Sequence, residues 1–249
     1  MSEPKAPEAA EPKGPVPTHK RFSRWAWEWV KSIAVALVIW FVVRALLVEA
    51  FRIPSGSMEN TLLVGDFLFV NKALYGAEVP FVHVRLPVFR EPHLSDIVVF
   101  DSKTEEGVKV VKRVVGMPGD TLEMRNTVLY RNGVRQNEPF ALWTNPESQP
   151  GESQSMRAWQ LAYVLPSVNK ATYAPDRRTW GPLVVPVDSF FVMGDNRDDS
   201  YDSRYWGFLG RMAIRGRPLF IYYSYDGSSW RALPAITAIR WNRIGTHPH

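Results

Sequence analysis

The feature that most constrains this 249-residue chain is an apolar stretch near its N-terminus, residues 25 to 51. Residues 33 to 43 carry no polar side chain, whereas a membrane-spanning helix needs about 20 apolar residues. Lys31 and Arg44 flank this run, and long basic side chains can reach the membrane interface while their stems stay in lipid. Residues 29 to 48 together are therefore long enough to span a bilayer.

Two other interpretations compete with a membrane span. A buried core helix would also be apolar, and a cleaved signal peptide would end in small residues spaced like those at 48 to 50. Arg44 argues against cleavage, because the residues before a cleavage site should continue the apolar region. Tryptophans are enriched at membrane interfaces, and three of them begin the stretch: Trp25, Trp27 and Trp29. We therefore predict an uncleaved transmembrane anchor over residues 25 to 50.

The chain before the anchor is rich in proline, alanine, glutamate and lysine. Such a composition buries too little apolar surface to offset the entropy of ordering, so residues 1 to 24 are expected to be a flexible tail. The positive-inside rule keeps this end in the cytoplasm, because it carries Lys13, Lys20, Arg21 and Arg24. Residues 51 to 249 are then expected to form an extracytoplasmic domain.

Composition argues against several classes of function. The formal net charge is +5, but the basic residues are scattered and no recognition motif is present, so nucleic acid is not an expected partner. The chain contains no cysteine. This excludes a disulfide framework, a cysteine-ligated zinc site and a thiol nucleophile.

The region after residue 50 is predicted to be mainly β. Strand-like runs occur at residues 66–70, 96–101, 108–115, 120–125, 129–135, 190–193 and 217–224. Asn132-Gly133 suits a tight hairpin turn, since both positions need positive φ. No strand–helix–strand alternation appears, which favours an antiparallel sheet. Residues 136 to 182 are poorly patterned and are interpreted as a long insert rather than a second independent domain.

Ser57 lies in the segment FRIPSGSMENT, residues 51 to 61, directly after the predicted anchor. A serine nucleophile needs a base. Two histidines, His83 and His93, lie in a proline-rich segment, and a catalytic triad is defined by geometry rather than by sequence order. A histidine base therefore remains one alternative.

A lysine base is the other alternative, because burial among apolar groups can lower the pKa of a lysine by several units. Lys112 lies in the run VKVVKRVVG, where strand alternation places it on one face with Val110 and Val114. The competing interpretation is an edge-strand lysine that faces solvent and discourages aggregation. Position on the strand does not decide between the two.

The segment from 191 to 207, FVMGDNRDDSYDSRYWG, carries four aspartates that could suggest calcium. A calcium loop needs glycine at its sixth position and glutamate at its twelfth. Counting from Asp198 finds Ser203 and Leu209 at these positions. Arg197 and Arg204 offer charge pairing, so we predict a salt-bridged structural loop and no metal site.

Three segments together resemble those of bacterial type I signal peptidases (leader peptidases). They are PSGSM at 54 to 58, KRVVGMPGD at 112 to 120 and GDNRDDSYDSRYWG at 194 to 207, in this order after a membrane span. The resemblance implies a mainly antiparallel β domain and a membrane-bound serine endopeptidase without a cofactor. It would remove signal peptides from exported preproteins at the bacterial cytoplasmic (inner) membrane, with the lipid bilayer and preproteins as partners.

The resemblance also implies roles for individual residues. Ser57 corresponds to the nucleophile and Lys112 to the general base of a Ser-Lys dyad. Ser55 corresponds to the side-chain donor of the oxyanion hole, next to the backbone N–H of Ser57. The remaining correspondences are support residues, with Ser200 orienting the lysine amine and Asp202 and Arg204 forming an ion pair. Ile53 and Val111 are expected to line shallow substrate pockets for small side chains.

The chain also departs from the family. Glu59-Asn60 stands where the family often has an apolar residue and proline, which is expected to alter the local turn or the approach of substrate. A single span and the lack of cysteine differ from double-spanning and disulfide-containing members. A membrane-anchored binding domain that has lost catalysis is the alternative from another functional class, and a cleavage assay separates the two.

Overall fold

A computed structural model describes residues 18–76, 84–145 and 152–249 of the chain. It divides into two compact units, Met1–Val43 and Arg44–His249. In the first unit, helix α1 spans Thr18–Val42, so residues 18 to 24, which were predicted to belong to the flexible tail, are helical. Its window Trp25–Val42 is long and apolar enough to cross a membrane, and none of it is buried within the protein. A core helix would bury these side chains, so their exposure argues against the core-helix alternative.

The predicted anchor extends too far at its C-terminal end. A short π-helix, Val43–Leu47, follows α1, and strand β1 begins at once as Val48–Arg52. Residues 48 to 50 pair with residues 69 to 71 of strand β2, Asp66–Asn71, and so belong to a sheet. Valine and phenylalanine favour β-strands. Apolar content alone could not distinguish this strand from a continuation of the helix.

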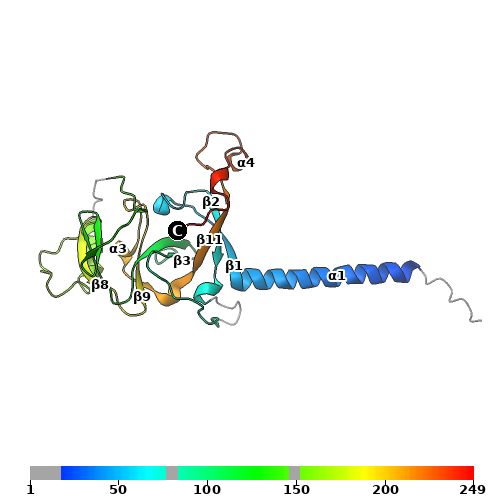
Figure 1. Cartoon of the computed structure of the whole chain (residues 1–249), viewed down its shortest axis with the longest axis horizontal. Helices are drawn as coiled ribbons and strands as arrows, with labels where there is room; N and C mark the ends of the chain where they lie inside the picture. Colours follow the sequence, from blue (N-terminus) through cyan, green and yellow to red (C-terminus); the bar gives the residue numbers. More distant parts are fainter. Residues whose placement is uncertain (1–17, 77–83, 146–151) are drawn as a thin grey trace, which may run out of the picture. The chain divides into compact units, whose positions relative to one another are not determined.

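The second unit is built on two antiparallel sheets, as the strand pattern predicted (Figure 1). The larger sheet has seven strands in the order β1-β2-β11-β3-β4-β9-β10. Its other members are β3 Ile97–Asp101, β4 Lys109–Gly116, β9 Ser189–Met193, β10 Leu209–Gly210 and β11 Ile214–Ser224. The fold is therefore mainly antiparallel β, together with one N-terminal apolar helix.

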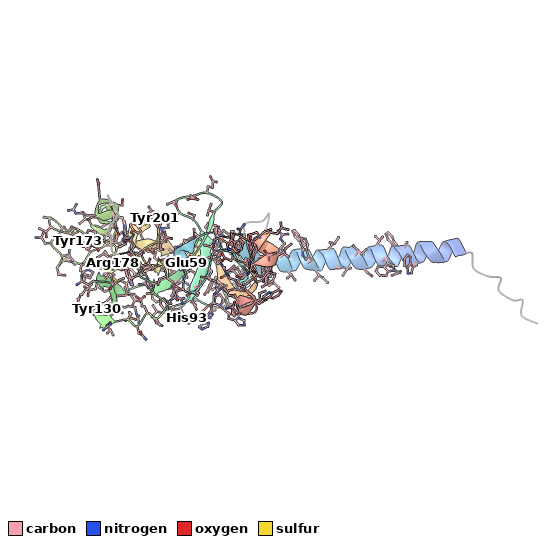
Figure 2. The ribbon with its side chains drawn as sticks, turned by 90° about the horizontal axis from the view of Figure 1, so that it is seen from above. Glu59, His93, Tyr130, Tyr173, Arg178 and Tyr201 are labelled. Carbon is pink, nitrogen blue, oxygen red and sulfur yellow. The ribbon has the colours of Figure 1, made fainter. Side chains whose placement is uncertain are left out.

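The smaller sheet has four strands in the order β7-β6-β5-β8. They are β5 Thr121–Arg125, β6 Val128–Arg131, β7 Val134–Arg135 and β8 Trp180–Val184. The predicted hairpin turn between β6 and β7 is confirmed, with φ of 53° at Asn132 and 77° at Gly133. Tyr130 and Tyr173 mark the end of the unit that holds this sheet (Figure 2).

The segment 136 to 182 contributes structure that its sequence did not reveal. It contains helix α2, Glu152–Gln160, and most of β8, while residues 146 to 151 lie outside the described residues. Trp180 and Leu183 of β8 are buried with Met156 of α2 in the core beneath the smaller sheet. Gly181-Pro182 interrupts the apolar alternation of β8, which explains why the strand is not evident from local pattern.

Strand β3 lies at the centre of the larger sheet and is buried on both faces. Ile97 and Val99 pack into one apolar cluster, and Val98 and Phe100 into another. The first cluster also contains Met58, immediately after Ser57, and the second contains Val114 of β4. The core therefore fixes both segments that carry the predicted dyad. Further short helices are α3 Ser203–Trp206 and α4 Pro234–Thr237.

Candidate active site

Ser57 lies on a short 3-10 turn, Gly56–Met58, between β1 and β2. Met58 is 1% exposed and anchors the turn in the core, while Ser57 remains half-buried. The backbone N–H of Asn196 donates to the Ser57 carbonyl at 3.1 Å, so a second segment holds the turn from outside. This arrangement presents the Ser57 hydroxyl on a fixed backbone.

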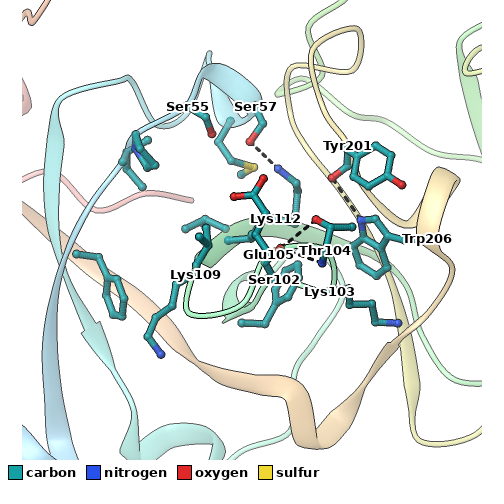
Figure 3. A pocket seen from close by; sticks show the side chains of 18 of the residues that line it. Ser55, Ser57, Ser102, Lys103, Thr104, Glu105, Lys109, Lys112, Tyr201 and Trp206 are labelled. Carbon is teal, nitrogen blue, oxygen red and sulfur yellow. Dashed lines mark hydrogen bonds between the residues drawn. The ribbon is translucent and has the colours of Figure 1, made fainter. Parts of the chain in front are cut away.

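Lys112 meets Ser57 from the larger sheet. It lies on β4 opposite Val98 of β3, and its Nζ donates to Ser57 Oγ at 2.5 Å (Figure 3). Lys112 is 2% exposed, so it is not the solvent-facing edge lysine of the competing interpretation. The two residues are 55 positions apart, and tertiary packing alone brings them together.

The charge state of Lys112 follows from its burial. Loss of water lowers the pKa of Lys112 from 10.5 to about 8, against the opposing pull of the Asp202 carboxylate. The Arg204 guanidinium lowers the pKa further, whereas Asp195 and Asp199 raise it. An appreciable fraction of neutral amine is therefore available near neutral pH. A neutral amine would accept a proton from the Ser57 hydroxyl, reversing the direction of their hydrogen bond.

The histidine alternative gains no support from the described residues. The His93 side chain is 61% exposed, its Nδ1 accepts a hydrogen bond from Arg90 Nε at 3.1 Å, and it lies 3.9 Å from Asp96. His83 lies outside the described residues. Across 18–76, 84–145 and 152–249, no histidine hydrogen-bonds Ser57, and Lys112 is the basic side chain in contact with its hydroxyl.

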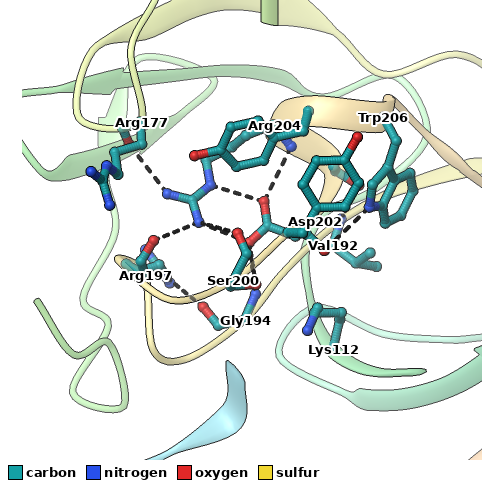
Figure 4. A network of polar contacts seen from close by, with 12 residues as sticks. Lys112, Arg177, Val192, Gly194, Arg197, Ser200, Asp202, Arg204 and Trp206 are labelled. Atoms are coloured by element: carbon teal, nitrogen blue, oxygen red, sulfur yellow. Dashed lines mark hydrogen bonds and ion pairs between the residues drawn. The ribbon is translucent and has the colours of Figure 1, made fainter. Parts of the chain in front are cut away.

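Asp202 and Arg204 form a fully buried ion pair behind Lys112 (Figure 4). Arg204 Nε donates to Asp202 Oδ1 at 2.8 Å, and Nη2 donates to Oδ2 at 2.9 Å. Burial alone would raise the pKa of Asp202, but the Arg204 guanidinium holds it below its ordinary value. Asp202 also caps α3 by accepting from the Arg204 backbone N–H, which fixes the start of that helix.

Ser200 contacts this ion pair rather than the lysine. Its hydroxyl donates to Asp202 Oδ2 at 2.7 Å, and its role in orienting the Lys112 amine stays a prediction. Gly194 explains how these parts come so close. A Cβ on Gly194 would lie 2.3 Å from Ser200 Oγ and 2.4 Å from the Ser57 carbonyl oxygen, so only glycine fits between them.

A second buried ion pair involves Arg113, the residue after Lys112, and sequence reasoning missed it. Arg113 donates from Nε and Nη2 to the two carboxylate oxygens of Asp195, at 2.8 and 2.7 Å. Thr61 Oγ1 donates to the same carboxylate at 2.5 Å, which ties in the chain after the Ser57 turn. Arg113 and Asp195 both lie inside the motifs that carry the family resemblance, so their opposite charges were the only sequence signal that could have suggested this pair.

The predicted salt-bridged loop is confirmed for most of the acidic residues between 191 and 207. Asp195 and Asp202 pair as described, and Asp198 pairs with Arg178 at 3.1 Å. Arg197 pairs with Glu138, outside this loop. Within the described ranges, no group of three or more His, Cys, Asp or Glu side chains could hold a metal ion.

A cleft of about 360 Å³ opens in front of Ser57 and Lys112 (Figure 3). The predicted substrate residues line it, with Ile53 buried and Val111 half-buried on the same apolar cluster. Ser55 is exposed at the cleft and caps no helix with its side chain, so its hydroxyl is free of a capping bond. The site thus combines the Ser57 hydroxyl, a lysine with a lowered pKa and an apolar cleft.

Known proteins resemble this chain over most of its length. The family described as signal peptidase, peptidase S26, matches residues 26–223. The chain is 38% identical over 229 residues to a signal peptidase I of Pseudomonas aeruginosa, covering 85% of this chain and 78% of that protein. It is 32% identical over 201 residues to a signal peptidase I of Bacillus licheniformis, covering 80% of this chain and 89% of that protein. The chain therefore belongs to the signal peptidase family, peptidase S26, and is an enzyme of that family.

Proposed function

We propose that this chain is a membrane-bound serine endopeptidase that removes N-terminal signal peptides from exported preproteins with a Ser57–Lys112 dyad. The observation that carries the proposal is the 2.5 Å contact between Ser57 Oγ and the Nζ of a buried lysine. A nucleophile within hydrogen-bond reach of its base is the signature of activated hydroxyl chemistry. A binding domain without catalysis would not require a lysine held in so costly a position.

In the first step, neutral Lys112 takes the proton from Ser57 Oγ as that oxygen attacks the scissile carbonyl carbon. The carbonyl oxygen becomes an oxyanion, which the Ser55 hydroxyl and the Ser57 backbone N–H would stabilise. Lys112 then passes its proton to the leaving amine as the peptide bond breaks. Water, deprotonated by the same lysine, then attacks the acyl carbon of the signal peptide that is ester-bonded to Ser57. The ester bond breaks, the signal peptide leaves with a new C-terminal carboxyl group, and Lys112 returns the proton to Ser57 Oγ.

The buried Asp202–Arg204 pair keeps Lys112 usable as a base. A lone carboxylate behind the lysine would hold its ammonium protonated, because Asp202 raises the lysine pKa. Arg204 compensates by lowering that pKa, so the pair supports Lys112 structurally with little net charge. Ser200 donates to Asp202 of this pair, and Gly194 lies between Ser200 and the Ser57 carbonyl.

The cleft suits an extended peptide with small side chains. Strand β4 pairs with β9 only from Arg113 onward, so within the described residues 109 to 112 pair with β3 alone. A peptide strand can add to such an edge through main-chain hydrogen bonds. Ile53 and Val111 would then line shallow apolar pockets that favour sites such as Ala-x-Ala.

Helix α1 would act as the anchor of this enzyme. Its apolar window supports a single membrane span, and the basic residues before it favour a cytoplasmic N-terminus. The catalytic domain would then face outward from the bacterial cytoplasmic membrane, where preproteins emerge. Lipid and preproteins are accordingly the partners that we propose.

The test is cleavage of a signal-peptide-bearing preprotein by the purified full-length chain in detergent. We expect wild type to release the mature protein and Ser57→Ala to be inactive with its fold intact. Ser228→Ala, a surface change outside the cleft lining, is the matched control and should cleave normally. Cleavage by Ser57→Ala above a few per cent of the wild-type rate would overturn the nucleophile assignment.

A further inference from the structure

The turn that carries Ser57 continues into a residue with an unusual backbone. Asn60 has φ of 87°, in the left-handed region that asparagine tolerates better than most non-glycine residues. Proline, which fixes φ near −65°, cannot adopt this conformation. The departure Glu59-Asn60 therefore has a structural consequence: the chain leaves the Ser57 turn along a path that proline would forbid.

Residues 138 to 142, which we call the strap, run beside the segment that holds this turn. The Leu142 backbone N–H donates to the Asp195 carbonyl at 2.7 Å, and the Arg197 N–H donates to the Leu142 carbonyl at 2.8 Å. The Glu138 carboxylate lies 2.6 Å from the Arg197 guanidinium. Main-chain bonds and a partly buried ion pair thus fix the strap to residues 195 to 197.

The centre of the strap contacts β4 next to Lys112. The guanidinium of Arg113, which is 1% exposed, lies 3.9 Å from the centre of the Phe140 ring in a cation–π contact. The Phe140 carbonyl accepts a hydrogen bond from Asn60 Nδ2 at 3.0 Å. The Asn60 amide therefore joins the Ser57 turn to a strap that is itself fixed to the lysine strand.

The Ser57 turn is held from two directions. Asn196 is 4% exposed, and its backbone N–H and its Nδ2 donate to the carbonyls of Ser57 and Gly56 at 3.1 and 3.3 Å. Asn60 restrains the chain immediately after the turn. Reacting atoms must be placed closely, since a misplacement of about 1 Å can cost about 10²-fold in rate.

We propose that Asn60 is a positioning residue for Ser57. The side-chain amide of Asn60, hydrogen-bonded to the Phe140 carbonyl, sets the position of Ser57 Oγ relative to Lys112. Asn60 acts through the turn and not on the substrate. The inference rests on the proposed role of Ser57 as nucleophile. It adds a function for the strap, which the sequence presented only as the start of an unpatterned insert.

The test compares four variants of the full-length chain in a steady-state cleavage assay. Asn60→Gly keeps the left-handed backbone but removes the amide, and Asn60→Asp keeps the shape but cannot donate to the Phe140 carbonyl. Asn60→Pro excludes the observed φ. Asn126→Gly is the matched control, because Asn126 also has positive φ, 46°, but lies in the turn between β5 and β6.

We expect Asn60→Gly and Asn60→Asp to lower kcat about tenfold with KM within about twofold, and Asn60→Pro to lower kcat at least as much. Assays run well below each unfolding midpoint separate positioning from stability, since a purely structural role would leave kcat unchanged there. Asn126→Gly should match wild type. The proposal is wrong if Asn60→Gly keeps wild-type kcat, or if kcat falls only in Asn60→Asp.

Ser57→Ala, measured in parallel, separates this inference from the proposed function. An active Ser57→Ala enzyme would overturn the function and the role of Asn60 together. An inactive Ser57→Ala enzyme beside a fully active Asn60→Gly enzyme would overturn the positioning role alone.

Discussion

Replacing Lys112 by methionine should abolish cleavage and, at the same time, make the domain more stable at neutral pH. Methionine has a similar length but no charge, and Lys112 is 2% exposed. The fall in the lysine pKa from 10.5 to about 8 corresponds to a cost of about 3 kcal/mol for the charged folded state, at 1.36 kcal/mol per pKa unit. Loss of the hydrogen bond to Ser57, about 1 kcal/mol, leaves an expected gain of about 2 kcal/mol.

The gain should depend on pH in a defined direction. Because the folded-state pKa of Lys112 is lower than the unfolded one, the unfolded state binds more protons between about pH 8 and pH 10.5. Wild-type stability therefore rises across this window, and the full cost of the charge is present below pH 8. The advantage of Lys112→Met should be largest below pH 8 and should shrink as the pH rises towards 10.5.

The assay is denaturant unfolding of the full-length chain in detergent, at several pH values from 7 to 10. Lys109→Met on the same strand is the matched control, because Lys109 is half-buried and pairs with Asp101 at 3.0 Å. The control should gain no stability from the change. A Lys112→Met protein that is less stable than wild type at pH 7, or whose advantage does not vary with pH, would refute the argument that burial of this charge is costly.

Other perturbations have equally definite outcomes. Ser55→Ala should lower kcat by about 10²–10³-fold, measured with the same preprotein, and an unchanged rate would mean that Ser55 is only a turn residue. Asp202→Asn leaves Arg204 buried without its partner and should cost about 3–5 kcal/mol in unfolding free energy. In any folded Asp202→Asn fraction, the ascending limb of kcat/KM should move to lower pH, since Asp202 raises the Lys112 pKa. Protease added to intact spheroplasts should digest the chain after residue 60, and full protection would contradict the proposed topology.

The sequence alone was informative wherever a property is local. Apolar length identified α1 as a candidate span, and β-branched or alternating runs located β2, β3, β4, β5, β9 and β11 to within a few residues of their observed bounds. Asn132-Gly133 predicted its turn because a tight hairpin turn needs positive φ only at its two central residues, which Asn and Gly adopt readily. The order of the three motifs was enough to indicate the family.

Local pattern was insufficient wherever partners come from distant parts of the chain. In the sequence, β1 looked like a continuation of the anchor and β8 like part of an irregular insert. Both segments are strands because they pair with distant strands, β1 with β2 and β8 with β5. Alternation placed Lys112 on a face of β4 but could not say whether that face was covered. Ser57, 55 residues away, and the core around Val98 and Val114 decide that it is.

The supporting contacts were decided by the tertiary structure for the same reason. The sequence contained Arg113, Asp195 and Asn60 without indicating their partners, because hydrogen bonds across 82 and 80 residues leave no local periodicity. Burial then makes the contact between Arg113 and Asp195 a constraint. A charge without water must find a fixed counter-charge, and an approach as close as that at Gly194 admits only glycine. The residue types in the sequence therefore indicated the chemistry of the site, whereas the positions of those residues relative to one another were decided by the tertiary structure.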